Sequence, residues 1–423
     1  MIVKQLQLNN VRVFQQAEFN FQPGMNLLVG VNGVGKSTVL DVLRILFSQL
    51  MPKISGSTDK PIKFTNSDIS VTSINKEFLE TNIVCKIGQT ELEYPGNYYK
   101  KSYVAYTQKE RQKKALANNG SIGFDSIETF ETEIQKQTLL AIFFSPHRSI
   151  LNSTKLQLKD DISPAHAEAL EARQLKLKDF VDWWQARKKL AEEGLGSGQT
   201  ILNALEQAVT EFLGCSNLHV DEKKKTLLIE KSGVTLDVKQ LSDGERGILA
   251  LVLDLTKRLA EANPYLENPA KGGKAVVLID ELDLHLHPKW QRTIVDQLTR
   301  TFPNCQFIAT THSPQIISEV QADSITFLIP EGNQVVVRPA RQAYGLDTNW
   351  ILDHLMDVHS RPKPAQKLID QIEDFLQEGE LDKAHEYVQK LREMLHGDDT
   401  EVVRLETSIY NLEALADEMD SEE

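Results

Sequence analysis

Cysteine is scarce in this chain of 423 residues, which contains only three: Cys85, Cys215 and Cys305. Their wide spacing excludes the closely paired cysteines of a zinc site and the dense cysteines of a small disulfide framework. We therefore expect three buried, reduced thiols, as is usual for proteins of the cytoplasm.

Long apolar stretches are absent too. No run of 18 apolar residues occurs, so the sequence predicts no membrane-spanning helix. Residues 1–14 alternate like a β-strand and lack the continuous apolar block of a signal peptide. The hydrophobic share of 41% and the charged share of 25% are those of an ordinary globular protein. We expect a cytoplasmic protein that has no membrane partner.

Lysine and arginine are outnumbered by acidic residues in one region of the chain. The net charge is −13, and the residues from Arg361 onward hold 7 Lys/Arg against 18 Asp/Glu. Residues 1–360 hold the other 40 Lys/Arg and 42 Asp/Glu, so they are close to neutral. An acidic C-terminal region repels phosphates, and we do not expect it to bind nucleic acid.

Apolar strands alternate with amphipathic helices, which indicates an α/β fold with a mostly parallel sheet. Fully apolar runs predict buried strands within residues 25–30, 138–149, 274–281 and 305–313. Helical periodicity is found at residues 36–50, 244–262 and 288–301. Two further runs, 324–330 and 334–340, would complete the edge of the sheet.

Residues 1–345 are expected to form one large domain. Within it, the alternating runs of residues 51–140 suggest an inserted antiparallel β lobe, and residues 160–215 a charged helical insertion. A hairpin is expected over residues 218–238. Residues 346–423 predict an acidic, helical C-terminal region, in which Asp399 or Thr400 caps the third helix.

The stretch GVNGVGKST, from Gly30 to Thr38, lies between a predicted strand and a predicted helix. Its glycines let backbone N–H groups turn toward phosphate oxygens, and the helix N-terminus favours the same anion. Lys36 would contact the β- and γ-phosphates, and the Ser37 hydroxyl would ligate Mg²⁺. The sequence thus predicts a site for ATP and Mg²⁺, whose contacts come from Gly30, Asn32, Gly33, Gly35, Lys36, Ser37 and Thr38.

Another apolar strand, Ala275 to Ile279, ends in the carboxylates of Asp280 and Glu281. Charges are seldom left at the end of such a strand without a partner. Asp280 is the candidate contact to Mg²⁺. Glu281 is the candidate base that accepts a proton from the attacking water.

The strand that starts at Cys305 ends at His312. A lone histidine at a strand end is usually structural, but the phosphate loop and the paired carboxylates favour a contact to the γ-phosphate or the attacking water. His285 and His287 have a spacing that suits a turn and lack a third ligand nearby, so a metal pair is not favoured there.

The stretch LSDGE, from Leu241 to Glu245, begins a long apolar helix. Ser242 and Glu245 have the spacing of a capping box, which by itself explains a well-capped helix and nothing more. Gly244 weakens the first turn, and this makes sense where something must approach the backbone closely. A helix N-terminus with a free hydroxyl binds anions. Because the chain already has a phosphate loop, the simplest explanation is that this second anion site serves the nucleotide of another subunit.

In order, Gly30–Thr38, Leu241–Glu245, Ile279–Glu281 with Asp283, and His312 resemble the phosphate loop, signature, Walker B, D-loop and H-loop of ABC-type ATPases. The resemblance covers about residues 1–340. It implies a head-to-tail homodimer, or a higher homo-oligomer, in which each ATP lies between one subunit's phosphate loop and the other subunit's signature. The resemblance then implies Lys36, Glu281 and His312 as catalytic residues, Ser37 and Asp280 as metal contacts, and Ser242, Gly244, Glu245 and Asp283 as further nucleotide contacts.

Within that family, residues 9–38 and the stretches ELDLHLHP and THSPQII resemble the SMC, RecF and OLD-like branch, whose members act on DNA or guard against phage. No long coiled-coil heptads occur, and no acidic Toprim-type cluster follows Pro339. The chain resembles stand-alone ATPases that are encoded with a nuclease partner in bacterial defence, such as the PtuA ATPases of Septu antiphage systems, which work with an HNH nuclease.

This likeness implies an ATP-hydrolysing switch that regulates a nuclease partner. The alternative is a DNA-repair ATPase that acts directly on DNA. A third interpretation is an ATP-bound scaffold that does not hydrolyse, and the intact Glu281 argues against it.

Two features of the sequence stay open. The Mg²⁺-sensing glutamine of ABC ATPases has no clear equivalent, and Asn66 or Asp68 lies in roughly its place. Residues 94–114 combine five tyrosines with six lysines and arginines. That mixture suits nucleic acid, but a half-buried strand followed by a solvated helix explains it as well. We favour the structural explanation and keep nucleic acid as a further partner to be tested.

Overall fold

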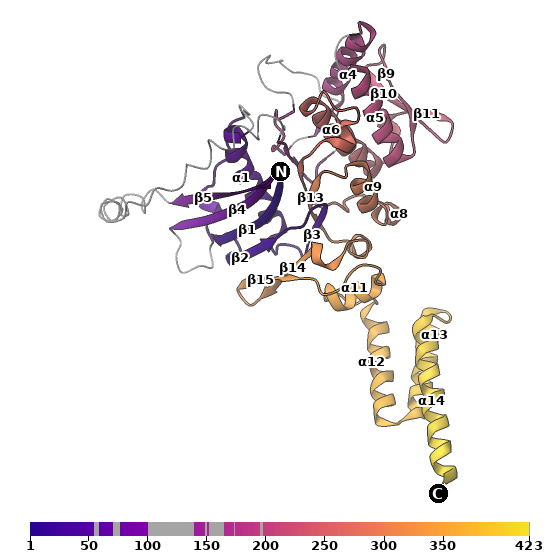
Figure 1. The fold of residues 1–423 in the computed structure, drawn as a ribbon. Helices are drawn as coiled ribbons and strands as arrows, with labels where there is room; N and C mark the ends of the chain where they lie inside the picture. The colour runs from indigo at the N-terminus through magenta and orange to yellow at the C-terminus, as the bar shows by residue number, and fades with distance from the viewer. Residues whose placement is uncertain are drawn as a thin grey trace, which may run out of the picture. The chain divides into compact units, whose positions relative to one another are not determined.

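The computed structural model describes residues 1–54, 59–70, 77–99, 139–148, 150–151, 165–172, 174–194 and 198–422. They form two compact units, Met1–Leu346 and Asp347–Glu423, both drawn in Figure 1. The expected boundary, after residue 345, lies next to this one. All three cysteines are buried and free, as expected. In the described part of the chain, no helix has both the length and the apolar character needed to cross a membrane.

A six-stranded sheet forms the centre of the first unit, with the strand order β15-β14-β3-β13-β12-β6. Neighbouring strands run parallel, except that β15 is antiparallel to β14. The central strands β3, β12 and β13 are buried along their whole length, as apolar strands of a parallel sheet are. The predicted mostly parallel α/β fold is therefore confirmed. The strands are β3 (Met25–Val29), β6 (Ala141–Phe144), β12 (Val276–Ile279), β13 (Gln306–Thr311), β14 (Ile325–Glu331) and β15 (Gln334–Pro339).

A second sheet is antiparallel and has the order β2-β1-β4-β5. Its strands are β1 (Ile2–Val11), β2 (Phe14–Asn20), β4 (Phe78–Ile87) and β5 (Thr90–Tyr99). Because β4 pairs with β1, the antiparallel lobe expected within residues 51–140 is not separate and includes the N-terminal strands. One hydrophobic core joins this sheet, helix α1 (Lys36–Ile54) and the central sheet, and it contains Leu6, Leu43 and Leu278.

Helices α4 (Leu177–Glu192), α5 (Gly198–Leu213) and α6 (Asp243–Ala262) pack together. They adjoin a small antiparallel sheet of β9 (Ser216–Asp221), β10 (Thr226–Lys231) and β11 (Val234–Asp237). In Figure 1 this group lies on the other side of β3 and β13 from the antiparallel sheet β2-β1-β4-β5. The other elements of the first unit are η1 (Asn66–Asp68), β7 (Ile150–Leu151), β8 (Leu175–Lys176), η2 (Val238–Gln240), α7 (Pro269–Gly272), α8 (Pro288–Gln291), α9 (Ile294–Thr301), α10 (Pro314–Ile317) and η3 (Ala322–Ser324).

Three local expectations need correction. The helical insertion expected over residues 160–215 contains α4 and α5, but its first described helix begins only at Leu177, and Glu168 has a φ of +53°, which a helix does not accept. The expected hairpin is a three-stranded meander, because Ser232 and Gly233 both have positive φ and form a second tight turn. The helix predicted over residues 288–301 is divided into α8 and α9.

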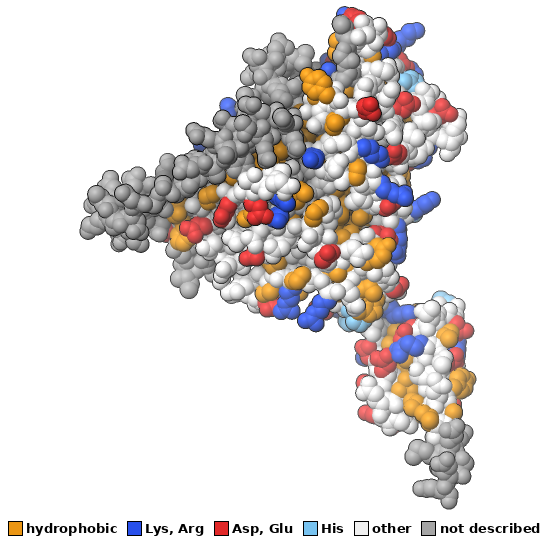
Figure 2. Space-filling view, viewed as in Figure 1, with side chains coloured by type: hydrophobic (Ala, Val, Ile, Leu, Met, Phe, Trp, Pro, Cys, Tyr) orange, Lys and Arg blue, Asp and Glu red, His pale blue; other side chains and the backbone are white. Residues whose placement is uncertain are grey.

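The second unit consists of α11 (Thr348–Leu355), α12 (Lys363–Glu378), α13 (Leu381–Leu395) and α14 (Thr400–Glu422). Helices α12, α13 and α14 share a hydrophobic core of their own. Asp399 is the cap of α14, since its carboxylate accepts hydrogen bonds from the backbone N–H groups of Glu401 and Val402, both at 3.0 Å. Figure 2 shows hydrophobic side chains among acidic ones on the visible face of this unit. Among the described side chains of α13 and α14, the exposed large hydrophobic ones are Met394, Val403, Tyr410, Leu412 and Leu415.

Candidate nucleotide site

Four strand ends meet at one edge of the central sheet. Strands β3, β13, β12 and β6 are parallel neighbours, so the loops that follow their carboxyl ends lie side by side. In open α/β sheets this edge is where ligands bind. The four loops carry the phosphate loop, the Asp280–Glu281 pair, His312, and the segment from Ser145 to Arg148.

The phosphate loop connects β3 to α1, which begins at Lys36. The Lys36 ammonium curls back over the loop and donates to the carbonyl oxygens of Gly30 at 2.8 Å and Val31 at 2.9 Å. Gly35 has a φ of +104°, and a Cβ there would lie 2.6 Å from a side-chain carbon of Val13. Asn32 and Gly33 lie on the exposed side of the loop. This glycine-dependent cradle at a helix N-terminus fits a chain of phosphates.

Asp280 connects the phosphate loop to two strands. Its carboxylate accepts hydrogen bonds from the Ser37 hydroxyl at 3.1 Å and from the Thr310 hydroxyl at 2.6 Å, and the residue is only 8% exposed. Mg²⁺ is usually held by one or two such protein oxygens together with substrate phosphates and water. Among the described residues, no group of three or more His, Cys, Asp or Glu is arranged to hold a metal ion.

Glu281 follows in an unusual backbone conformation, with a φ of +50°. Its N–H donates to the Thr310 hydroxyl at 2.7 Å. No described residue donates a hydrogen bond to its carboxylate. The carboxylate is close enough to Lys36 to act on the ammonium: burial lowers the pKa of Lys36, and the charges of Asp280, Glu281 and Asp283 oppose that change.

Asp283 holds the loop that carries His312. Its carboxylate accepts hydrogen bonds from the Thr311 hydroxyl at 2.7 Å and from the His312 backbone N–H at 3.1 Å. Burial and the positive charge of Lys36 lower the pKa of His312, so its imidazole is neutral at pH 7. The structure therefore brings Lys36, Asp280, Glu281 and His312 together, and it uses Asp283 to fix the position of His312.

The signature stretch forms a hydrogen-bond network of its own. Ser242 caps α6: its hydroxyl donates to the Glu245 carboxylate at 2.8 Å and accepts from the Glu245 N–H at 3.3 Å, which confirms the predicted capping box. Glu245 also pairs with Lys231 of β10. Burial opposes ionisation of Glu245, but the hydrogen bonds from Lys231 and Ser242 leave its pKa below the ordinary value. Among the described residues, no hydrogen bond or ion pair links Ser242 or Glu245 to the phosphate loop.

Gly244 touches the D-loop of its own chain. A Cβ at this position would lie 2.3 Å from the carbonyl oxygen of His285, which itself has a φ of +61°. The close approach inferred from the sequence is therefore real, but the group that approaches is a backbone carbonyl of the same chain. His287 is the cap of α8, where its ring nitrogen accepts from the Lys289 N–H at 3.2 Å.

Two arginines near the site were not predicted. Arg12 pairs with Asp41 and Asp68 and lies 3.4 Å from the Thr38 hydroxyl. Arg148 follows β6 and donates to backbone carbonyls at the end of β12. Both arginines lie outside the motifs, so no motif spacing in the sequence identifies them. Knowing that β6 lies beside β12 in the sheet would have pointed to Arg148.

The expected metal-sensing position at Asn66 or Asp68 is not supported. The Asp68 carboxylate is occupied by Arg12 and by the N–H of Thr65, and the Asn66 side chain accepts from the Tyr98 hydroxyl at 2.8 Å. On the side of β12 away from β13, the loop beside the strand end is the one after β6, because Phe144 pairs with Ile279.

Part of the basic, aromatic stretch belongs to the antiparallel sheet. Tyr94 receives a hydrogen bond from Lys53 at 3.2 Å, and the ring of Tyr99 lies 6.0 Å from that of Phe78. These contacts favour the structural explanation for the tyrosines of β5. Residues 100–114 lie outside the described residues.

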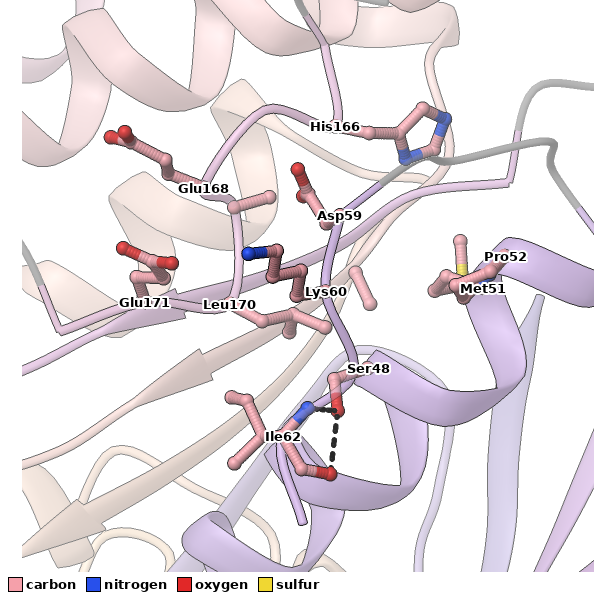
Figure 3. A pocket seen from close by; sticks show the side chains of 12 residues that line it. Ser48, Met51, Pro52, Asp59, Lys60, Ile62, His166, Glu168, Leu170 and Glu171 are labelled. Atoms are coloured by element: carbon pink, nitrogen blue, oxygen red, sulfur yellow. Dashed lines mark hydrogen bonds between the residues drawn. The ribbon is translucent and has the colours of Figure 1, made fainter. Parts of the chain in front are cut away.

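A small hollow at the other end of α1 is separate from the candidate site. Figure 3 shows Ser48 and Met51 of α1 beside it, with His166 and Lys60 from other segments. Its volume of about 30 Å³ suits a water molecule, not a nucleotide. The Ser48 hydroxyl accepts from the Ile62 N–H at 2.8 Å, one of the bonds drawn in the figure. Burial lowers the pKa of His166, so this histidine is neutral at pH 7.

Comparison with known proteins places the chain among ATPases. The family model described as "AAA domain, putative AbiEii toxin, Type IV TA system" matches residues 25–318. The "Retron Ec83 probable ATPase" of Escherichia coli is 27% identical, and the alignment covers 88% of this chain and 79% of the relative. "Septu protein PtuA" of Bacillus thuringiensis is 24% identical, with 94% of each chain covered. A solved SMC head domain from Thermotoga maritima is 14% identical over 81% of this chain and 100% of its own, with a TM-score of 0.44.

The fold and the site are those of a P-loop ATPase. The chain belongs to the AAA family whose model covers residues 25–318. It is an ATPase related to Septu PtuA and to retron ATPases, as the sequence predicts.

The contact between Gly244 and His285 gives a matched pair of substitutions. Gly244→Ala should destabilise the protein by about 1–3 kcal/mol, the usual cost of forcing extra atoms into a packed site. Gly247→Ala meets its nearest atom at an ordinary 3.5 Å and should be neutral or stabilising, because alanine favours helix more than glycine does. Thermal unfolding of both variants checks this, and an equal response of the two would contradict the assigned contact.

Proposed function

We propose that this chain is an ATP-hydrolysing dimeric switch that regulates an associated nuclease in prokaryotic antiphage defence. The relatives support the defence role, since they include a Septu protein and retron ATPases. One observation supports the dimeric switch above all: the chain carries two half-sites, and its Ser242–Glu245 stretch makes no described hydrogen bond or ion pair with its own phosphate loop. We place the protein in the cytoplasm, where its buried thiols stay reduced.

In this proposal the phosphates of ATP lie along the phosphate loop and the N-terminus of α1. Lys36 binds the β- and γ-phosphates, and Ser37 with Asp280 holds Mg²⁺, which neutralises charge on the phosphates. The Glu281 carboxylate, which no described residue engages, accepts the proton of the attacking water. Neutral His312 supplies a hydrogen bond to the γ-phosphate or to that water.

The signature of a second subunit would complete each site. Its approach to a triphosphate requires that its own carboxylates do not repel the anion. In the structure Glu245 is paired with Lys231, and Asp243 is paired with Arg246. The first turn of α6 can therefore present Ser242 and backbone N–H groups to phosphates without a net negative charge.

The base assignment predicts the behaviour of Glu281→Gln. The glutamine keeps the size of the side chain but accepts no proton, so kcat for ATP hydrolysis should fall by about 10²-fold or more. ATP-bound dimers should then accumulate, and light scattering after gel filtration in Mg²⁺ and ATP would detect them. Lys36→Ala, which removes the phosphate contact, is the control that should stay monomeric. A Glu281→Gln protein that is monomeric at saturating ATP would argue against the dimeric switch.

We assign nuclease docking to the second unit, residues 347–423. This unit has a core of its own and is rich in acidic residues, and Val403 and Tyr410 of α14 are 53% and 59% exposed. The two residues lie seven apart and so share one face of the helix. A partner with a basic and partly apolar surface would suit this face. By its resemblance to PtuA systems, the expected partner is an HNH nuclease.

The docking assignment predicts a separation of function. Val403→Asp combined with Tyr410→Ala should abolish co-purification with the proposed HNH nuclease partner, because it removes apolar contact area. The kcat of ATP hydrolysis should stay within about twofold, since surface substitutions have small effects elsewhere. Asp382→Ala, at the start of α13, serves as a surface control. Undiminished capture of the nuclease by the double variant would refute this docking face.

A further inference from the structure

Arg148 lies where the strand order of the sheet places it beside the proposed base. Strand β6 pairs in parallel with β12, and the N–H of Asp280 donates to the carbonyl of Phe144 at 2.9 Å. The chain then turns through Ser145, Pro146 and His147. This turn delivers the Arg148 guanidinium to the end of β12.

The guanidinium binds three consecutive backbone carbonyls. It donates to the carbonyl oxygens of Asp280 at 2.8 Å, Glu281 at 2.8 Å and Leu282 at 3.1 Å. These carbonyls follow the last residue of β12, so the ladder of the sheet no longer supplies their donors. A planar fork with five N–H donors can serve several carbonyls at once, whereas an ammonium acts as a point charge.

The contacts of Arg148 bear on the orientation of Glu281. A non-glycine residue with positive φ is strained and persists only where its surroundings hold it. Glu281 is held on both sides, by the Thr310 hydroxyl at its N–H and by Arg148 at its carbonyl. Removing Arg148 leaves the Glu281 carbonyl with the Leu284 N–H alone, at 3.1 Å, so the left-handed conformation is held less firmly.

Arg148 does this without engaging the carboxylates of the site. Burial lowers the pKa of Arg148 to about 10, and the charges of Asp283, Asp280 and Glu281 act against that change. The guanidinium is therefore protonated at pH 7, but its described hydrogen bonds all go to carbonyl oxygens. The Asp280 carboxylate stays with Ser37, and no described residue engages the Glu281 carboxylate.

The same residue also touches the signature helix. A Cβ on Gly247 of α6 would lie 3.5 Å from the carbonyl oxygen of Arg148 and 4.0 Å from its Cγ. Gly247 lies in the second turn of the helix that Ser242 caps. A displacement of α6 would therefore press on Arg148, and through it on the backbone that carries Glu281.

We propose that Arg148 is a positioning residue that orients Glu281 for hydrolysis and links it mechanically to the signature helix of the same chain. The inference rests on the proposed role of Glu281 as the base. Through this link, binding of Ser242 to the ATP of a neighbouring subunit would change the rate of ATP hydrolysis in the chain's own site.

The test compares steady-state kinetics of Arg148→Met and Arg148→Lys with those of Arg258→Met. Arg258 is a matched control: it is buried and also donates to two backbone carbonyls, those of Ala165 and Ala167, but it pairs with Asp254 on α6 and makes no described contact with the site. Arg148→Met should lower kcat by about 10²-fold, as expected for a misplaced catalytic group. Its KM and its affinity for ATP should change by less than about twofold. Arg148→Lys should recover part of kcat, and Arg258→Met should lower thermal stability with kcat nearly unchanged.

Two further variants keep the proposal testable if Arg148→Met does not fold. Gly247→Leu should displace Arg148 and reproduce the selective loss of kcat, whereas Gly247→Ala should not. Glu281→Gln combined with Arg148→Lys should be no slower than Glu281→Gln alone, because both act through one group. Three outcomes would overturn the proposal. The first is a wild-type kcat in both Arg148→Lys and Gly247→Leu, and the second is an equal loss of kcat and of ATP affinity in Arg148→Met. The third is a double variant whose loss of kcat is the sum of the two single losses in free energy. Full activity of Glu281→Gln would instead refute the base assignment itself.

Discussion

The buried carboxylate of Asp280 joins three segments that lie far apart in the sequence. It stands at the end of β12 and accepts hydrogen bonds from Ser37 at the start of α1 and from Thr310 in β13. An isolated charge buried to this degree is unstable unless polar partners surround it. The interaction therefore needs the parallel order of β3, β13 and β12, which brings the carboxyl ends of these strands to one edge. The other polar contacts of the site extend from this point to Glu281, Asp283 and His312.

Within a single chain, the signature helix packs against the loops that follow the strands of the phosphate-binding site. Gly244 fits against the carbonyl of His285, and Gly247 lies against Arg148. Helix α6, which would contact the nucleotide of a neighbouring subunit, is thus packed against the backbone near the chain's own Asp280. Because protein interiors have few voids, a displacement of α6 would move the residues packed against it. Under the proposed dimeric arrangement, ATP binding in one site would be felt in the other through these two glycine contacts.

Much of the fold could be predicted from local patterns. Apolar runs that end in a glycine, a pair of carboxylates or a histidine identify β3, β12 and β13, and the Ser242–Glu245 spacing identifies the cap of α6. Contacts that depend on the sheet order could not be predicted in this way. The sequence indicates that another group approaches the backbone of Gly244, but it does not show that this group is the carbonyl of His285. Nor does the position of Arg148 along the chain indicate its contact with Glu281. The meander after α5 was missed because its second turn depends on positive φ at Ser232 as well as at Gly233.

Complementation between two inactive variants tests the shared site most directly. A Lys36→Ala chain keeps its signature but loses its phosphate loop, and a Ser242→Arg chain keeps its phosphate loop but blocks its signature. The composite-site account predicts that neither variant alone retains ATP in a dimer, whereas a mixture forms heterodimers that retain ATP in one intact site and regain hydrolysis. A mixture that stays as inactive as its components, while wild-type protein of the same preparation retains and hydrolyses ATP, would contradict a site shared between two chains.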